Sequence, residues 1–344
     1  MRSMEFDGRR IGEGANPLVV PEIGINHEGE LSKAKRMVRD AADSGAECVK
    51  FQMHIAESEM IDDEVVPVNA DTSIQEIIRR CSLTRQEHEE LKAYVESFDM
   101  IYLCTPFSRE AANILEEMGV GAFKIGSGEC NNYPLLEHIA SFGKPIIIST
   151  GMNNLGSIDR SVEIVEEAGV EFALLQCTSM YPTPYEKAHL GAIDDLLDHY
   201  TDAPVGLSDH TPGIHMSIAA IAKGASIIEK HFISDKDWSG PDVPVSINPA
   251  ELADLIEGVN AVHAGLGGRK TIVEGEEQTS KFAYASVVAN KEIKEGEELT
   301  SENIWVKRPG TGDILADEFH KLLGKHAAMV IEADTQLSWE HVDE

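Results

Sequence analysis

Residues 204–232, PVGLSDHTPGIHMSIAAIAKGASIIEKHF, contain two short apolar runs, each followed by a polar cluster with a histidine. If runs 204–210 and 226–232 are neighbouring parallel strands, side chains two apart share a face. Ser208 and His210 then lie on one face of the first strand. Glu229 and His231 lie on one face of the second. Both histidines are therefore expected at the carboxyl ends of adjacent strands, where active sites form in parallel α/β folds.

The two histidines allow two interpretations. Two imidazoles that converge on one edge of a sheet can hold a divalent metal with open coordination positions. Alternatively, each histidine is an ordinary polar residue at the end of a strand. The pair alone leaves both interpretations open, and the remaining sequence is needed to choose between them.

The alternation of strand and helix extends across most of the chain. Apolar runs occur at 19–26, 48–52, 100–106, 122–128, 145–150, 172–178, 204–210 and 226–232. The segments between them repeat apolar residues at spacings of three and four, which predicts helices. Several of these segments end at a glycine, namely Gly45, Gly119 and Gly169. Eight strand–helix repeats predict an α/β protein with a (β/α)8 TIM barrel.

The chain is longer than one barrel requires. A barrel of roughly 250 residues leaves room for a small appendage in a chain of 344 residues. The long stretch between 52 and 100 predicts an elaborated second loop. Glycines and charges without apolar periodicity predict a linker at 269–281, and short alternating runs follow. We therefore expect a barrel at 1–268 and a small domain at 282–344.

The composition excludes some classes of partner. A formal net charge of −31 argues against binding to nucleic acid. No apolar run is long enough to span a membrane, and the first ten residues lack the apolar core of a signal peptide, so we expect a cytoplasmic protein. The five cysteines lack CxxC spacing, which predicts reduced core residues.

Two lysines lie within apolar runs, Lys50 and Lys124. A buried lysine needs a partner, and salt bridges with Glu22 and Glu229 are one interpretation. The other is an anion site, in which the lysines act with nearby hydroxyls and glycine amides to bind a phosphate or carboxylate. The alternation places Lys230 on the outside of the barrel, in a structural role.

The combined residues suggest a reaction at a carbonyl group. A metal held by imidazoles polarises a carbonyl oxygen, and the anion site suggests a phosphorylated substrate. A Schiff-base aldolase that uses Lys124 fits these residues almost as well. The residues alone leave both reactions open.

Nine motifs now identify a known family. PEIGINHEG, VKFQ, CTPFSREAA, KIGSGECNNYPLL, GKPIIISTGM, YPTPY, GLSDH, EKHF and VKRPG occur in this order, and from about Ile11 to the end the chain resembles bacterial N-acetylneuraminate (sialic acid) synthases. The resemblance implies a barrel followed by an antifreeze-like (SAF) domain. It also implies a domain-swapped homodimer, in which one subunit's small domain covers the other's barrel mouth.

The resemblance further implies that phosphoenolpyruvate condenses with the open-chain aldehyde of N-acetylmannosamine. Carbon 3 of phosphoenolpyruvate attacks the aldehyde, carbon 2 takes up water, and phosphate leaves by C–O cleavage. His210 and His231 would hold Mn²⁺, or Mg²⁺ or Co²⁺ in its place, which polarises the aldehyde. Glu22 is the first candidate for proton transfer, with Glu129 and Glu229 as further candidates.

The implied binding residues form three groups. Those for phosphoenolpyruvate are Lys50, Thr105, Lys124, Ser127, Ser149 and Ser208; those near the sugar are Glu22, Gln52, Asn69, Tyr181 and Asp242; those from the partner subunit's small domain are Phe282 and Arg308. Ser179 stands where the family often has asparagine. Because serine is shorter, its contact with the ligand is expected to run through water.

Two further alternatives remain open. A sister synthase would make legionaminic or pseudaminic acid from a 6-deoxy sugar by the same reaction in a different pocket. From a different class of protein, the chain could be a sugar- or ice-binding protein with an inactive barrel, although the complete set of lysines and histidines argues against this.

Overall fold

The computed structural model describes residues 2–61, 66 and 72–343. The chain divides into two compact units, Met1–Gly267 and Gly268–Glu344. Each unit is described by itself below. The division lies next to the predicted end of the barrel at residue 268.

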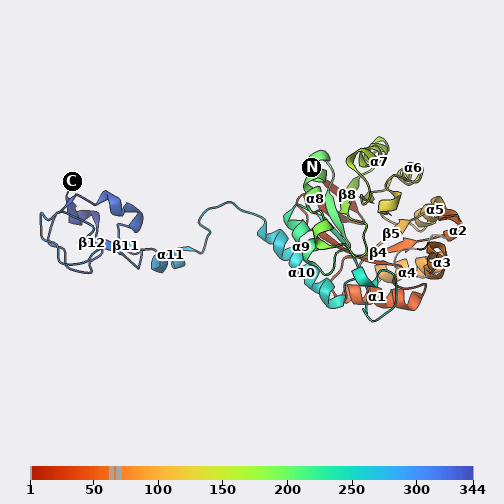
Figure 1. The fold of residues 1–344 in the computed structure, drawn as a ribbon, viewed down its shortest axis with the longest axis horizontal. Coiled ribbons are helices and arrows are strands. Elements are labelled where there is room, and N and C mark those ends of the chain that lie inside the picture. Colours follow the sequence, from red (N-terminus) through yellow and green to blue (C-terminus); the bar gives the residue numbers. More distant parts are fainter. Residues whose placement is uncertain (1, 62–65, 67–71, 344) are drawn as a thin grey trace. The chain divides into compact units, whose positions relative to one another are not determined.

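The first unit is a near-closed (β/α)8 barrel, as the sequence predicted (Figure 1). Its parallel strands are β3 (Leu18–Gly24), β4 (Cys48–Met53), β5 (Ile101–Pro106), β6 (Phe123–Ile125), β7 (Ile146–Ser149), β8 (Phe172–Cys177), β9 (Val205–Asp209) and β10 (Ile227–His231). The sheet order is β5-β4-β3-β10-β9-β8-β7-β6, so the first and last barrel strands pair. Each predicted apolar run overlaps one of these strands, and β3 and β4 each extend one residue beyond their runs.

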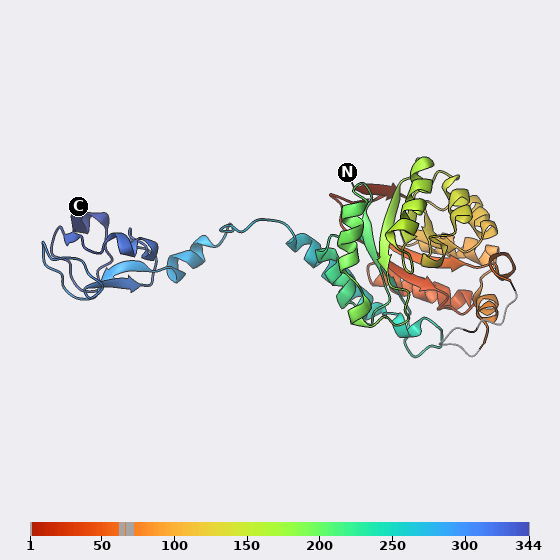
Figure 2. The same ribbon diagram turned by 45° about the horizontal axis from the view of Figure 1, so that its top comes forward.

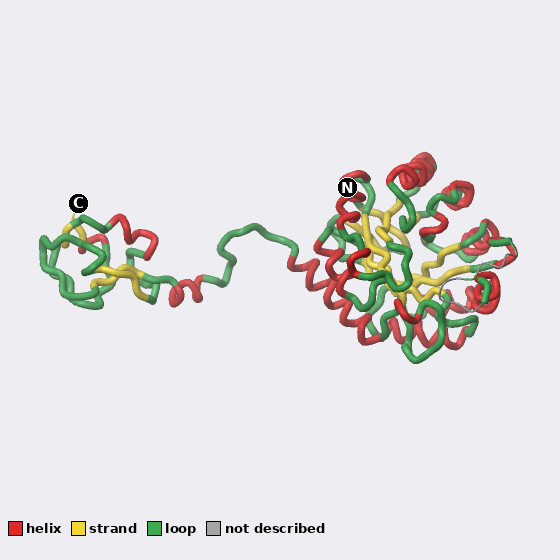
Figure 3. The backbone as a smooth tube through the Cα atoms, in the orientation of Figure 1, coloured by secondary structure: helices red, strands yellow, loops and turns green. Residues whose placement is uncertain are grey.

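Helices surround the strands on the outside of this unit (Figures 2 and 3). They are α1 (Leu31–Asp43), α4 (Arg85–Glu96), α5 (Arg109–Glu117), α6 (Tyr133–Ala140), α7 (Leu155–Glu167), α8 (Gly191–His199), α9 (His215–Ala222) and α10 (Pro249–Gly265). The predicted elaboration after β4 contains α2 (Ala56–Glu59) and α3 (Ile74–Cys81). Short 3-10 turns at Ser127–Glu129, Tyr185–Lys187 and Val243–Val245 complete the loops.

Local sequence signals begin and end these helices. Thr84 and Glu87 form a reciprocal capping box at the start of α4. The glycines predicted as helix stops follow α1, α5 and α7, with φ of 88° at Gly45, 71° at Gly119 and 69° at Gly169. This left-handed conformation is easily adopted by glycine and ends a helix without steric cost.

An N-terminal hairpin precedes the barrel and was not predicted. Strands β1 (Ser3–Phe6) and β2 (Arg9–Gly12) pair antiparallel around Asp7 and Gly8, whose φ values of 47° and 76° suit a tight hairpin turn. Met4, Phe6 and Ile11 pack into the same buried cluster as inward side chains of the barrel strands. The hairpin therefore closes the amino-terminal end of the barrel.

The second unit has a small core of its own. Its strands are β11 (Ser286–Ala289), β12 (Ile304–Lys307), β13 (His326–Ala327) and β14 (Val342–Asp343), with 3-10 turns at Ala316–Lys321 and Trp339–His341. Val287, Ile304 and Leu337 are among its buried residues. Helix α11 (Glu277–Ala283) occupies the end of the segment predicted as linker.

Two composition-based expectations can be compared with this structure. The five cysteines are all buried and free, as predicted. Among residues 2–61, 66 and 72–343, no helix is both long and apolar enough to cross a membrane.

Candidate active site

The two lysines predicted within strands are buried and lie at the carboxyl end of the barrel. Lys50 Nζ is 2.6 Å from Glu22 Oε2 and donates to Thr105 Oγ1 at 3.1 Å. Lys124 Nζ donates to Ser149 Oγ at 2.7 Å. The three strands β3, β4 and β5 thus bring one carboxylate, one ammonium group and one hydroxyl together.

Glu229 lies between the two lysines. Its Oε1 accepts a hydrogen bond from Ser208 Oγ at 3.0 Å. Its Oε2 is 3.5 Å from Lys124 Nζ and 3.8 Å from Lys50 Nζ. The salt bridges considered in the sequence analysis therefore exist, and they hold both ammonium groups at the same edge of the barrel.

Burial and pairing act against each other on these groups. Burial tends to lower the pKa of Lys50, but Glu22 and Glu229 outweigh it and the pKa is raised above its usual value. For Lys124 burial prevails over Glu229, and the pKa is lowered. Burial also raises the pKa of Glu22 despite the neighbouring Lys50. A carboxyl group of this kind can hold a proton more readily than an exposed one.

These groups border a cavity of about 310 Å³. The structure brings twelve of the predicted site residues to its wall: Glu22, Lys50, Gln52, Thr105, Lys124, Ser127, Ser149, Ser179, Tyr181, Ser208, His210 and His231. They come from segments that are far apart in the sequence. They meet in space because every barrel strand directs its carboxyl end to the same mouth.

A second cavity, of about 650 Å³, adjoins the first and shares Gln52, Phe107, Ser179, Tyr181 and His231 with it. Asp242 lines this second cavity. The remaining lining is largely apolar and consists of Ile25, Ile74, Ile77, Ile78, Met180, Pro182 and Pro241, together with His54. Burial raises the pKa of Asp242 to about 6.

The two histidines at the ends of β9 and β10 lie close together, with ring centroids 5.3 Å apart. His210 Nδ1 is 3.1 Å from the carbonyl oxygen of Thr178, to which it donates. Burial tends to lower the pKa of His210, but Cys177 and the Thr178 carbonyl outweigh it, and the pKa is raised above its usual value. His231 Nδ1 is buried, has no hydrogen-bond partner among the described residues, and lies 3.7 Å from Asp242 Oδ2. Burial lowers the pKa of His231 well below its usual value, so the ring is neutral.

This arrangement suits a metal with few protein ligands. Two buried imidazoles, one of them fixed by a backbone carbonyl, can supply nitrogen donors of the kind that a divalent transition metal prefers. In the described part of the chain, no group of three or more His, Cys, Asp or Glu side chains is arranged as a metal cage. The pair would therefore leave several coordination positions for substrate or water.

Three predicted site residues are absent from the described lining of the first cavity, and a fourth cannot be placed. Asn69 falls outside the described residues. Asp242 lines the second cavity, as stated above. Phe282 and Arg308 belong to the second unit, where both are exposed, and Arg308 makes no hydrogen bond or ion pair with any described residue.

Some residues that line the two cavities were not predicted as site residues from the sequence. His54 follows Lys50 and Gln52 at the same spacing of two, so the alternation that placed those residues could also have placed His54. Phe107 follows the last residue of β5, and only the structure shows that it borders both cavities. Cys177, predicted as a core residue, also lines the first cavity.

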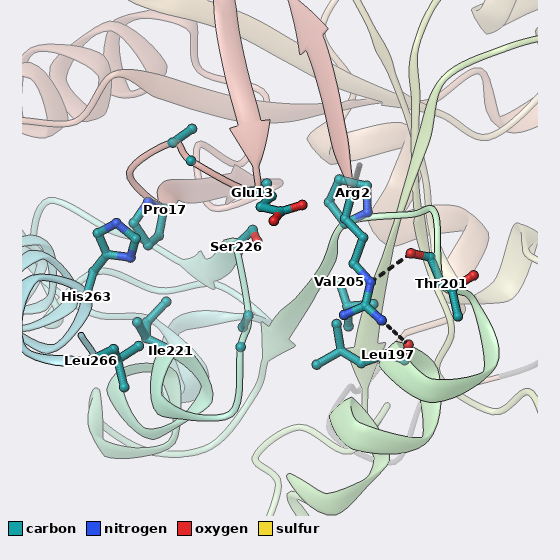
Figure 4. A pocket seen from close by; sticks show the side chains of 16 residues that line it. Arg2, Glu13, Pro17, Leu197, Thr201, Val205, Ile221, Ser226, His263 and Leu266 are labelled. Atoms are coloured by element: carbon teal, nitrogen blue, oxygen red, sulfur yellow. Dashed lines mark hydrogen bonds between the residues drawn. The ribbon is translucent and has the colours of Figure 1, made fainter. Parts of the chain in front are cut away.

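A further pocket lies at the opposite end of the barrel (Figure 4). It has a volume of about 530 Å³ and is bordered by the loop after the hairpin and by segments around α8 and α9. Arg2 donates from Nε to the Thr201 carbonyl oxygen at 2.9 Å and from a terminal nitrogen to that of Leu197 at 2.6 Å. Its guanidinium group thus satisfies carbonyls at the end of α8, which is a structural role.

Comparison with known proteins shows the family to which the chain belongs. The NeuB family matches residues 37–271, and the SAF domain matches residues 284–343. The chain belongs to the NeuB family. NeuB-family enzymes condense phosphoenolpyruvate with an amino sugar and use a divalent metal, so the chain is a phosphoenolpyruvate-condensing nonulosonic acid synthase followed by a SAF domain.

Individual relatives of the NeuB family carry different names. The N,N'-diacetyllegionaminic acid synthase of Campylobacter jejuni is 38% identical over 92% of this chain and 97% of its own. The human N-acetylneuraminate-9-phosphate synthase is 34% identical over 98% and 95%. A solved structure of N-acetylneuraminic acid (sialic acid) synthetase from Leptospira borgpetersenii, in complex with citrate, has a TM-score of 0.74 at 31% identity and covers 81% of this chain and 95% of its own.

Proposed function

We propose that this chain is an N-acetylneuraminate synthase, which condenses phosphoenolpyruvate, N-acetylmannosamine and water to N-acetylneuraminate and phosphate. The observation that carries the proposal is that two buried lysines and two buried histidines border one cavity. An anion and an aldehyde bound there would lie within reach of each other. Such proximity is what a condensation requires.

The lysine side of the cavity suits phosphoenolpyruvate. Its phosphate and carboxylate need cations and hydroxyl donors, which Lys50, Lys124 and the neighbouring serines and threonine supply. Ser127 Oγ accepts a hydrogen bond from the Gly151 amide at 3.0 Å, so its own hydrogen is free to point toward an anion. Glu229 holds both lysines at the cavity before the substrate arrives.

The histidine side suits the acceptor. His210 and His231 would hold a divalent metal, for which we propose Mn²⁺, and the bound metal would supply polarisation of the aldehyde carbonyl. Carbon 3 of phosphoenolpyruvate bonds to the aldehyde carbon, water adds at carbon 2, and the bond between carbon 2 and the phosphate oxygen breaks. We propose that Glu22 gives the aldehyde oxygen its proton, with Glu229 and Glu129 as the other carboxyl groups proposed for proton transfer.

The second cavity is the proposed site for the rest of the sugar. Gln52, Tyr181 and Asp242 offer polar contacts for hydroxyl and acetamido groups. Ser179 is placed at the junction of the two cavities, where we propose a water-mediated contact. Asn69 is proposed to contact the sugar as well.

A 6-deoxy acetamido sugar is the second candidate acceptor. The apolar residues around the second cavity, such as Ile77, Ile78 and Pro241, favour a methyl group over a hydroxyl group. The product would then be a legionaminic or pseudaminic acid. The reaction at the first cavity would be unchanged.

We also propose a homodimer in which the small domain covers the partner's barrel mouth. The described lining of the two cavities contains no arginine, and Arg308 of the partner subunit would add a cation there. Phe282 is 63% exposed, which suits a contact with a partner. Residues 269–281 would connect the two domains.

The test is phosphate release from phosphoenolpyruvate with a panel of acceptors, with and without Mn²⁺. The panel contains N-acetylmannosamine, its 6-phosphate, N-acetylglucosamine and a 6-deoxy diacetamido hexose. In ¹⁸O-labelled water, C–O cleavage puts the label into the sugar acid and leaves the phosphate unlabelled. The highest kcat/KM is expected with N-acetylmannosamine.

Other outcomes would decide against this proposal. A preference for the deoxy sugar would replace the acceptor and keep the reaction. Labelled phosphate would exclude C–O cleavage. Trapping of pyruvate on Lys124 by borohydride, without phosphate release, would favour the Schiff-base aldolase. Sugar binding without turnover would favour a binding protein.

A further inference from the structure

A chain of hydrogen bonds leads from the candidate acid Glu22 to a carboxylate outside the first cavity. Gln52 Nε2 donates to Glu22 Oε1 at 2.8 Å. His54 Nε2 lies 3.0 Å from Gln52 Oε1. His54 Nδ1 lies 3.0 and 3.1 Å from the two carboxylate oxygens of Glu59. Two carboxylates therefore bracket one amide and one imidazole.

The donors and acceptors of this chain determine its orientation. Because the Gln52 amide nitrogen faces Glu22, its oxygen faces His54 and needs a donor there. The Glu59 carboxylate needs a donor from the other ring nitrogen. Both conditions are met when His54 donates from Nδ1 to Glu59 and from Nε2 to the Gln52 oxygen. A ring that donated only to Glu59 would not hold the Gln52 oxygen and would favour a flipped amide.

The pair is held rigidly. The His54 and Glu59 side chains are each 5% exposed. The His54 ring stacks on Phe107, with centroids 4.2 Å apart and an interplanar angle of 15°. Glu59 Oε2 also accepts from the backbone amide of Ile55 at 3.3 Å. Helix α2 directly follows β4, so one short segment supplies both members of the pair and Gln52.

Close approach at the other end depends on Gly24. Its φ is +55°, and a Cβ there would lie 3.1 Å from Glu22 Oε1 and 3.3 Å from Gln52 Nε2. A glycine at this position leaves room for the hydrogen bond between the two side chains. The backbone of β3 and the segment after β4 thus both contribute to the orientation of the Gln52 amide toward Glu22.

We propose that His54 and Glu59 are a positioning pair for the condensation, which holds the Gln52 amide with its nitrogen toward Glu22 and the acceptor. The inference rests on the proposed function, because the acceptor is assigned to the cavity wall that contains Gln52. His54 lines the second cavity but not the first, which Lys124 lines. Loss of the pair therefore affects use of the acceptor and leaves use of phosphoenolpyruvate unchanged.

The first test compares Glu59→Gln with Glu57→Gln. Glu57 lies on the same helix, and its side chain is 69% exposed, so both variants lose one negative charge from α2. Glu59→Gln is expected to raise the KM for the acceptor about tenfold, because a charge-assisted hydrogen bond is lost. The KM for phosphoenolpyruvate should stay within about twofold. Glu57→Gln should match the wild type in both values.

A double-mutant cycle tests whether the pair acts through Gln52. In a Gln52→Ala background, Glu59→Gln should have no further effect on the KM for the acceptor. An equal cost in both backgrounds would show an independent role and overturn the proposal. His54→Asn should reproduce the acceptor effect of Glu59→Gln, and an equal rise in both KM values would also overturn it.

The proposed function and this inference can fail separately. If the wild type releases no phosphate with any acceptor, both are wrong. If the wild type is active and Glu59→Gln behaves as Glu57→Gln does, only the positioning role is wrong. Thermal unfolding of each variant accompanies the kinetics, and a KM change confined to the acceptor in a variant with unchanged unfolding supports the role.

Discussion

The barrel strands contain three buried lysines, Lys50, Lys124 and Lys230, which differ in the face of the strand on which they lie. Lys50 and Lys124 point into the cavity. Lys230 points outward and pairs with Asp209 Oδ2 at 3.2 Å and with the carbonyl oxygen of Thr211. Burial lowers the pKa of Lys230, and Asp209 opposes the shift. The same residue type therefore neutralises a core carboxylate on one face and offers charge to an anion on the other.

Removal of the Lys124 charge should act on phosphoenolpyruvate first. Lys124→Met keeps the apolar stem and removes the ammonium group. We expect kcat/KM for phosphoenolpyruvate to fall by about 100-fold or more, since a charge-assisted contact in a buried site is lost. Steady-state phosphate release measures it. Lys223→Met, which removes a surface ion pair with Asp194, is the control and should be nearly silent. Equal losses in both variants would contradict the assignment.

Acid should destabilise the barrel through a buried histidine away from the site. His88 Nδ1 is 2.7 Å from the Tyr102 hydroxyl, and burial lowers the pKa of His88 to about 4. The unfolded chain takes up a proton below about pH 6.5, whereas the folded ring stays neutral until about pH 4. The free energy of unfolding should therefore fall by about 1.4 kcal/mol per pH unit from this group across that window.

His88→Gln keeps a hydrogen-bonding group and cannot take up the proton. Its free energy of unfolding should fall less steeply between pH 6.5 and 4 than that of the wild type, as measured by denaturant titrations followed by circular dichroism. His215→Gln, which removes an exposed histidine at the start of α9, should leave the slope unchanged. Parallel slopes for the wild type and His88→Gln would contradict the prediction.

At the scale of elements, the N-terminal hairpin supports the fold and lies far from the chemistry. Phe6 is 3% exposed and packs among inward barrel residues. Phe6→Ala should lower the free energy of unfolding by about 3–5 kcal/mol, because it leaves a cavity in that cluster. The KM values should not change, since the site is at the opposite end of the strands. Glu5→Ala, exposed on the same hairpin, should cost little.

The elements differ in how well they could be predicted. Barrel strands buried on both faces read as continuous apolar runs, and glycine stops separated them from amphipathic helices. The hairpin arms have four residues each and contain charges, so periodicity did not reveal them, although Asp7-Gly8 is a hairpin signal. The site followed from strand alternation, which brought Lys50 and Gln52 to one face. The role of His54 depends on Glu59, and no sequence pattern shows that contact.

At the scale of the whole molecule, the strongly acidic chain has to bind an anionic substrate in the proposed function. A net charge of −31 disfavours the approach of an anionic substrate. In the proposed function, Lys50 and Lys124 would offset this field at the barrel mouth together with Arg308 of the partner subunit, because Glu22 and Glu229 already pair with the two lysines. Salt screens the distant surface charges more than these buried groups. The sequence predicted both domains, but a composite site between subunits depends on assembly and stays a proposal.

Complementation between two inactive variants tests that assembly. Arg308→Ala should lower turnover sharply while the barrel stays folded, and Lys124→Met inactivates the barrel site. In a swapped dimer, a mixed pair joins the intact barrel of one subunit to the intact small domain of the other. Half of the dimers are mixed after exchange, and each has one complete site, so activity should return to about one quarter of the wild type. If Arg308 acts on its own barrel, mixing restores nothing, and near-normal activity of Arg308→Ala alone removes it from the site.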